Sequence, residues 1–349
     1  STERFDPTNQ ITVSGSSTSI NGSLSASYTV FDGFRRNAQS KARGADLTSA
    51  EANYTSQEFQ IALQTKQAFF NALAADELVR VSETRIARAV RQLQTTRDRL
   101  SAGSAIRSDT LQSFVEWANA RLQLINSQTQ RATSSANLAR LIGFDGDVRA
   151  VGDESIAFVV DLDTAAIRAE ALAYGPTIEQ IMAAARSADA QVSVSRAAYF
   201  PSVTASYSRS LAGQDFDNLR GSWSGRVGLS WQIFQGFSRE TGMARSAAAQ
   251  DAAHARIDDT RRQVNAQLTQ QFASLQSATI RIQIAEASLA AATEDLRVQQ
   301  ERYRLGAATI LEVMQSQISV DQAEVDGVQA RLDYLLARAQ IEAIVGRTL

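Results

Sequence analysis

Two acidic residues occupy matching positions in the two halves of this 349-residue sequence. Asp109 and Glu312 are 203 residues apart, and each follows a glycine, Gly103 or Gly306, in the segments RLSAGSAIRSD and RYRLGAATILE. A carboxylate in the first turn of a helix interacts favourably with the helix dipole, by under about 1 kcal/mol. On these residues alone, the simplest interpretation is that each acid marks the start of a helix, and a cation-binding constriction is the alternative.

The sequence offers few residues for catalysis. His254 is the only histidine and there is no cysteine, so neither a Ser-His-Asp nor a Cys-His set can form, and a histidine metal cluster is excluded. No phosphate-binding loop or dinucleotide fingerprint occurs. We therefore expect no enzyme, no catalytic residue, no cofactor and no metal site. His254 is interpreted as a surface residue.

The composition excludes further classes of protein. The formal net charge is −2 and no basic run occurs, so nucleic acid is not an expected partner. No stretch of about 18 apolar residues exists, which excludes a membrane-spanning helix. Only three prolines occur, Pro7, Pro176 and Pro201, while alanine, glutamine, arginine and serine are abundant. This composition favours long, partly solvated helices over a thick globular core.

The sequence also matches itself when it is shifted by 203 residues. The matches include Gly22 with Gly225, Phe31 with Phe234, Gly33 with Gly236, Arg36 with Arg239, Arg99 with Arg302, Gly103 with Gly306 and Gly143 with Gly346. Chance similarity between alanine-rich helices would match alanines rather than isolated glycines. We therefore predict an internal duplication.

The duplication predicts the domain organisation. Residues 1–143 form the first repeat, with a strand segment at 19–31, a long helix at 35–100 and a return helix at 105–142. A linker follows at 144–163. Residues 164–346 form the second repeat, with helices at 164–174 and 176–199, strands at 200–211 and 222–234, a long helix at 238–304 and a return helix at 308–345. The first repeat lacks a counterpart of 164–199, so we expect about 40 or more additional N-terminal residues in the natural protein.

The strand segments alternate between apolar and small polar residues. In 222–234, Trp223, Val227 and Trp231 share one face, and serines dominate the other. An ordinary half-buried antiparallel sheet is one interpretation. The other is a membrane barrel, because Trp223 and Trp231 would lie about 26 Å apart, close to the height of the apolar band between two aromatic girdles. One chain has too few strands to close a barrel, and several chains would therefore have to form one barrel together. We interpret Tyr28, Tyr207, Trp223 and Trp231 as lipid-interface anchors.

The two long helical runs are each about 100 Å in length at 1.5 Å per residue. Their apolar residues are spaced mostly by 3, 4 or 7, as in coiled coils, and the seam is rich in alanine. Gly103 and Gly306 can adopt the left-handed conformation that ends a helix. The expected fold class is therefore mainly α with a small β part, built from long antiparallel helical hairpins.

Several motifs occur in a specific order: TVFDGF and QIFQGF between strand and helix, YGPTI, AAYFPSVTASYS, RDRLSAGSAIRSDTLQS and QERYRLGAATILEVMQSQ. With these, the sequence resembles the TolC-like outer membrane efflux protein family over essentially its whole length. The resemblance implies a homotrimer whose strands share one transmembrane β-barrel and whose helices form a periplasmic α-barrel. It also implies an outer membrane exit duct of a tripartite efflux pump or type I secretion system, with a periplasmic adaptor and an inner-membrane pump as partners.

The resemblance also implies two sites. It predicts that the periplasmic gate or lumen constriction is formed by Asp109, Ser108, Tyr303, Glu312 and Gln315. It predicts that the tips that dock the adaptor include Arg99, Leu100, Gly103, Arg302, Leu305 and Gly306. Because Gln315 is not acidic, only one ring of three carboxylates is expected, at Glu312. A second departure is that Phe34 and Phe237 stand where the family usually has another glycine.

The alternative function is structural: a trimeric coiled-coil fibre, adhesive or structural, with a small β-head. A fibre would predict a thick, leucine-rich seam and no aromatic bands on the strands. The alanine-rich seam and the two tryptophans favour the duct.

Overall fold

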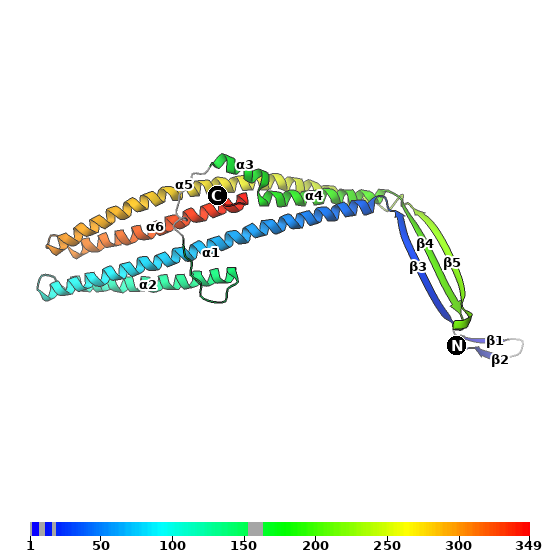
Figure 1. Cartoon of the computed structure of the whole chain (residues 1–349), viewed down its shortest axis with the longest axis horizontal. Helices are drawn as coiled ribbons and strands as arrows, with labels where there is room; N and C mark the ends of the chain where they lie inside the picture. The colour runs from blue at the N-terminus through cyan, green and yellow to red at the C-terminus, as the bar shows by residue number, and fades with distance from the viewer. Residues whose placement is uncertain (1, 7–10, 16–18, 153–162) are drawn as a thin grey trace. The chain divides into compact units, whose positions relative to one another are not determined.

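The computed structural model describes residues 2–6, 11–15, 19–152 and 163–349. Two compact units can be distinguished, Ser1–Ala50 with Met182–Arg256, and Glu51–Ile181 with Ile257–Leu349. The described part is mainly helical with few strands, as predicted (Figure 1). None of its helices combines the length and the apolar character that crossing a membrane requires.

The first unit contains a three-stranded antiparallel sheet. Its strands are β3 (Ile20–Phe31), β4 (Ser202–Gly213) and β5 (Arg220–Ser230), in the order β3-β4-β5. Because β4 pairs on both sides, β3 and β5 are the edges of this sheet. A second antiparallel pair, β1 (Thr2–Asp6) with β2 (Ile11–Gly15), is not indicated by the sequence pattern.

The predicted strand 222–234 is wrong at its C-terminal end, because β5 stops at Ser230. Ser230 pairs with Ser202, the first residue of β4, and the residue before it is Pro201, which has no backbone N–H to continue the ladder. Trp231 therefore lies outside the strand, where its indole N–H donates to the carbonyl of Tyr199 at 3.3 Å. Trp223 and Trp231 thus do not mark the two ends of one strand.

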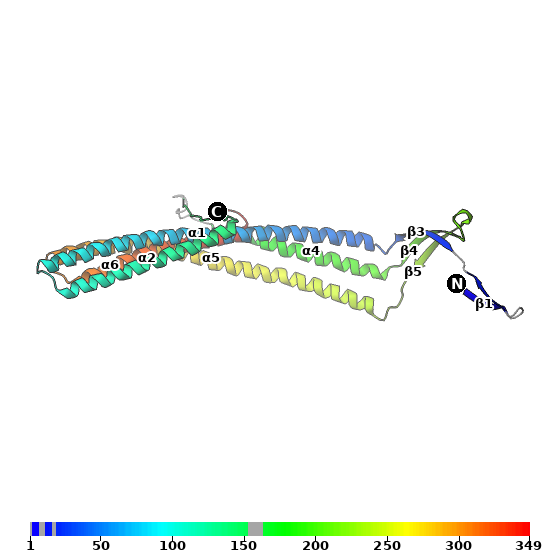
Figure 2. The same cartoon turned by 90° about the horizontal axis from the view of Figure 1, so that it is seen from below.

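Six α-helices are described. They are α1 (Arg35–Ser101), α2 (Arg107–Ile142), α3 (Thr164–Tyr174), α4 (Pro176–Arg196), α5 (Ser238–Arg304) and α6 (Ile310–Val345). The predicted helix 176–199 ends earlier, and its last three residues form the short 3-10 helix η2 (Ala197–Tyr199). In the second unit, α1 lies beside α2 and α5 beside α6 in both views (Figures 1 and 2).

Small side chains form the contact between α1 and α2. Ser82 of α1 and Ser127 of α2 share a hydrogen bond of 2.8 Å, and Ala120 of α2 is fully buried. Most other buried residues of α2 are also serine or alanine. Small residues permit close approach of two helices, but they bury little apolar area. This contact therefore tolerates little added volume.

We expect Ala120→Leu to destabilise the second unit, because inserting methylenes into a close-packed contact typically costs about 1–3 kcal/mol. Ala136→Leu is the matched control, since Ala136 lies exposed on the same helix. The midpoint of thermal unfolding, followed by far-UV circular dichroism, measures both changes. Equal midpoints in the two variants would contradict a tight α1–α2 contact.

Candidate functional site

The two helix-ending turns at the tips have the same backbone geometry. Gly103 and Gly306 have φ of 72° and 77°, in the left-handed region. The N–H of Ser104 donates to the carbonyl of Arg99, and the N–H of Ala307 donates to that of Arg302, at 2.8 Å in both turns. These are the hydrogen bonds of a glycine-ended helix. The predicted role of both glycines in ending the long helices is confirmed.

Arg99 and Arg302 close their own turns. Nη2 of Arg99 donates to the carbonyl of Ser104 at 3.1 Å, and Nη2 of Arg302 donates to the carbonyl of Ala307 at 3.2 Å. Each guanidinium thus stabilises the carbonyl end of its helix, which adds a structural role to the predicted role in docking. Leu305 is 71% exposed and Leu100 is partly exposed. The two leucines, together with the exposed Ile106 and Leu311, therefore give the tips an apolar surface.

Tyr303 is the buried centre of the tip region. Its side chain is 5% exposed, and its hydroxyl has no hydrogen-bond partner within the described residues. The guanidinium of Arg99 lies 4.3 Å from the centre of its ring and also donates to its carbonyl. Burial raises the pKa of Tyr303, the Asp109 carboxylate adds to the increase, and Arg99 opposes it. The structure thus brings Tyr303, Asp109 and Arg99 together, without a hydrogen bond between the hydroxyl and the carboxylate.

Glu312 belongs to a capping box at the start of α6. Its Oε2 accepts from the backbone N–H of Thr309 at 2.6 Å and from the Thr309 hydroxyl at 2.9 Å. In return, the Glu312 N–H donates to the Thr309 hydroxyl oxygen at 3.4 Å. The hydrogen bonds from Thr309 lower the pKa of Glu312. Glu312 therefore starts a helix, as its position after Gly306 suggests, while its side chain stays exposed.

Asp109, the counterpart of Glu312, does not take part in a capping box. The N-cap residue of α2 is Ile106, which has no side-chain oxygen, so no capping box forms there. The Asp109 carboxylate instead lies close enough to Tyr303 to raise the pKa of its hydroxyl. Ser108 and Gln315, the other two predicted gate residues, are exposed. The two repeats thus carry an acid at the same position but engage it differently.

The predicted aromatic anchors lie on the sheet or just beyond it. Tyr207 stacks on Trp223 with a centroid distance of 6.5 Å, and Trp223 is 75% exposed. Tyr28 is exposed as well, and its hydroxyl accepts from Arg36 at 3.2 Å. Trp231 is the exception, because it follows β5.

The strand-to-helix junctions also repeat their geometry. Phe34 and Phe237 occupy matching positions, and both have φ of 64°. Arg36 donates to the carbonyl of Thr29 at 2.9 Å, and Arg239 donates to the carbonyl of Gln232 at 3.2 Å. The matched arginines thus hold the ends of the matched strand segments, in support of the proposed duplication.

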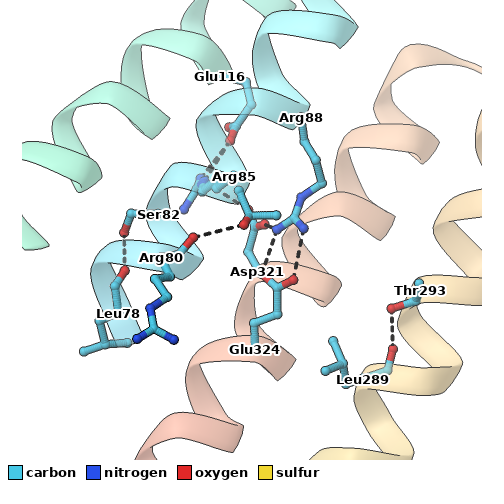
Figure 3. Close-up of polar contacts among 11 residues, drawn as sticks. Leu78, Arg80, Ser82, Arg85, Arg88, Glu116, Leu289, Thr293, Asp321 and Glu324 are labelled. Atoms are coloured by element: carbon cyan, nitrogen blue, oxygen red, sulfur yellow. Dashed lines mark hydrogen bonds and ion pairs between the residues drawn. The ribbon is translucent and has the colours of Figure 1, made fainter. Parts of the chain in front are cut away.

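Sequence reasoning missed a buried network of charges in the second unit (Figure 3). Arg88 of α1 makes two hydrogen bonds to Glu324 of α6, at 2.7 and 3.0 Å, and a third to Asp321 at 2.7 Å. Arg85 pairs with Glu116 of α2 at 2.7 Å and with Asp321 at 3.0 Å. Two guanidiniums therefore connect α1 to α2 and α6.

Burial and ion pairing have opposing effects on the pKa values in this network. Burial raises the pKa of Asp321, and the nearby arginines only partly oppose it. For Arg88, burial disfavours the charge, but the hydrogen bonds to Glu324 and Asp321 outweigh it and raise the pKa. One signal for this network is present in the sequence: RIAR at 85–88 and DQAE at 321–324 place like charges on one helix face. Nothing in a single sequence shows that these two faces meet.

We expect Arg88→Gln to destabilise the second unit by about 3–5 kcal/mol, because it leaves buried carboxylates without their partner. The control is Arg297→Gln, which removes an exposed pair with Glu294 and should leave stability unchanged. Chemical denaturation of the assembled protein measures both. Adding Asp321→Asn and Glu324→Gln to Arg88→Gln should restore part of the loss, and no restoration would contradict the charge argument.

We also expect Thr309→Ala to destabilise the start of α6 by about 1 kcal/mol at neutral pH. The folded-state pKa of Glu312 is lowered, so its contribution is present above the ordinary glutamate pKa and is lost as pH falls through the lowered value. The difference from wild type should therefore shrink in acid. Denaturation midpoints across pH test this, with Glu312→Gln as a control that keeps the cap without titrating. A difference that does not vary with pH would contradict it.

The amino-acid sequence is similar to those of known outer membrane proteins. The outer membrane efflux protein family matches residues 2–144 and 167–347. A pyoverdine export outer membrane protein of Pseudomonas aeruginosa is 26% identical, over 94% of the chain and 69% of that protein. Protein CyaE of Bordetella pertussis is 25% identical, over 91% of the chain and 67% of that protein.

Solved structures resemble the fold. A structure of CusC has a TM-score of 0.88 at 18% identity, and the match covers 99% of this chain and 81% of that one. The outer membrane protein VceC of Vibrio cholerae has a TM-score of 0.81 at 16% identity, covering 95% and 87%. The similarity therefore extends over nearly the whole described fold.

Proposed function

Since the chain belongs to the outer membrane efflux protein family and is an outer membrane channel for efflux or secretion, we propose that three copies of it form one duct. The observation that carries the proposal is the sheet β3-β4-β5, whose two edge strands are unpaired within the described chain. Unpaired backbone groups in lipid cost several kcal/mol each. Pairing of β3 and β5 with neighbouring copies removes that cost and encloses a shared pore.

We propose that the tip region is the periplasmic entrance of this duct. The guanidinium of Arg99 in one helical hairpin lies over the ring of Tyr303 in the other and donates to its carbonyl, so this contact opposes separation of the hairpins. Glu312 caps its helix through Oε2, which leaves Oε1 to face a cation in the lumen. Three exposed carboxylates around a narrow opening would concentrate cations there. Ser108 and Gln315 supply the uncharged polar surface beside them.

We further propose that a periplasmic adaptor, coupled to an inner-membrane pump, docks on the two tips. The exposed side chains of Leu100 and Leu305 provide apolar contacts, and Gly103 and Gly306 add no side chain beside them. No heavy atom lies within 4 Å of a side-chain carbon built at Gly103 or Gly306, so a bulky residue there would project outward. Arg99 and Arg302 support docking indirectly, by holding the turns.

We expect Gly103→Trp with Gly306→Trp to abolish efflux by blocking the adaptor. The control is Gly103→Ala with Gly306→Ala, which introduces the same strain at positive φ without the bulk. Cargo export from cells, compared at equal amounts of assembled protein in the outer membrane, measures the effect. Unchanged export in the tryptophan variant, or equal loss in both variants, would contradict docking at the tips.

Single-channel recording of the full-length protein in a planar bilayer tests the duct itself. We expect stepwise conductance that divalent cations block from the side of the tips, and weaker block in Glu312→Gln because a ring of charge is lost. Arg99→Ala should increase the open fraction, because it removes the contact with the ring and carbonyl of Tyr303. A folded assembly that stays silent even with this substitution would overturn the proposed duct.

A further inference from the structure

One face of the sheet β3-β4-β5 is lined by hydroxyl groups. The odd positions of β3 from Ser23 to Thr29 and the even positions of β4 from Ser202 to Ser210 all carry serine or threonine. The register places these positions opposite one another, and the hydroxyls of Ser210 and Ser222 are 2.8 Å apart across β4 and β5. The three strands thus present one continuous surface of small, polar side chains.

A charged residue stands in the middle of this surface. Arg226 of β5 is opposite Ser206 of β4, which is opposite Ser27 of β3, and its side chain is exposed. Arg220, at the first position of β5, belongs to the same face. The strands β3, β4 and β5 contain no aspartate or glutamate. No carboxylate within these strands therefore offsets the charge of Arg226.

The opposite face of the same sheet is apolar and aromatic. Tyr207 and Trp223 stack there, and Val227 and Leu229 are both more than two-thirds exposed. Arg209 also lies on this face, opposite Trp223 in the register. If lipid surrounds the duct, the aromatic face meets the lipid and the hydroxyl face meets the water inside. Arg226 and Arg209 therefore lie on opposite sides of one sheet.

Building on the proposed duct, we propose that Arg226 selects cargo by charge in the strand-lined part of the pore, favouring anions. A three-fold assembly brings three copies of this guanidinium to one level, and rings of arginine attract anions in pores. Guanidinium is a bidentate donor that suits carboxylate and phosphate groups, so the favoured cargo carries such groups. Selection here is opposite in sign to the acidic entrance.

The test is the ion selectivity of single channels of the full-length protein under a potassium chloride gradient. At about 10 mM salt the electrostatic screening length is about 30 Å, so a fixed charge acts well into the lumen. We expect Arg226→Ser to lower the anion-over-cation permeability ratio by about twofold or more, and Arg226→Glu to lower it further. Arg226→Lys should keep the wild-type ratio, and the differences should fade at about 1 M salt, where the screening length is about 3 Å.

Arg209→Ser is the matched control, because it removes the same group from the lipid-side face and should not change the ratio. Conducting channels with the same ratio in wild type and Arg226→Ser would overturn the inference while leaving the duct in place. An equal shift in Arg226→Ser and Arg209→Ser would also overturn it, since the effect would not belong to one face. A wild-type protein that never conducts would overturn the duct, and the inference with it.

Discussion

Close approach of α1 and α2 through small side chains is the constraint on which this helical hairpin depends. The mutual hydrogen bond of Ser82 and Ser127 and the fully buried Ala120 show how little side-chain volume separates α1 from α2. Such a contact buries little apolar area, so it contributes less to stability than a leucine seam of the same length. The arginine–carboxylate network among α1, α2 and α6 adds ion pairs that connect these three helices.

The two matching halves of the chain have the same backbone geometry at their turns but differ in their side-chain contacts. The glycine-ended turns and the arginines that close them recur at both tips. The two acids differ: Glu312 is held in a capping box, whereas Asp109 has Ile106 at the position that matches Thr309 and raises the pKa of Tyr303 instead. The arginines of the network have no counterpart either, since Ser288 and Ala291 stand at the matching positions. The two matching halves of the chain thus carry different sets of side-chain contacts.

Local signals made much of this fold predictable from sequence. Glycine positions, proline spacing and alternation mark where helices and strands begin and end, and these depend on few neighbours. The end of β5 could not be predicted, because it is set by where the partner strand starts, after Pro201. The burial of Tyr303 and the meeting of Arg88 with Asp321 also escaped prediction, since both depend on which helix faces touch. The roles proposed for the tips and the gate stay predictions drawn from resemblance.

The absence of carboxylates from β3, β4 and β5 has a consequence for acid surroundings. Guanidinium keeps its proton at any pH that a cell envelope meets, so the sign of the strand-lined surface is fixed. The carboxylate of Glu312 has a lowered pKa, so it also keeps its charge in mildly acidic surroundings. In the proposed duct, the charges of Arg226 and Glu312 would both persist over this range. The proposed preference for charged cargo would then stay constant as the medium becomes mildly acidic, without any movement of the chain.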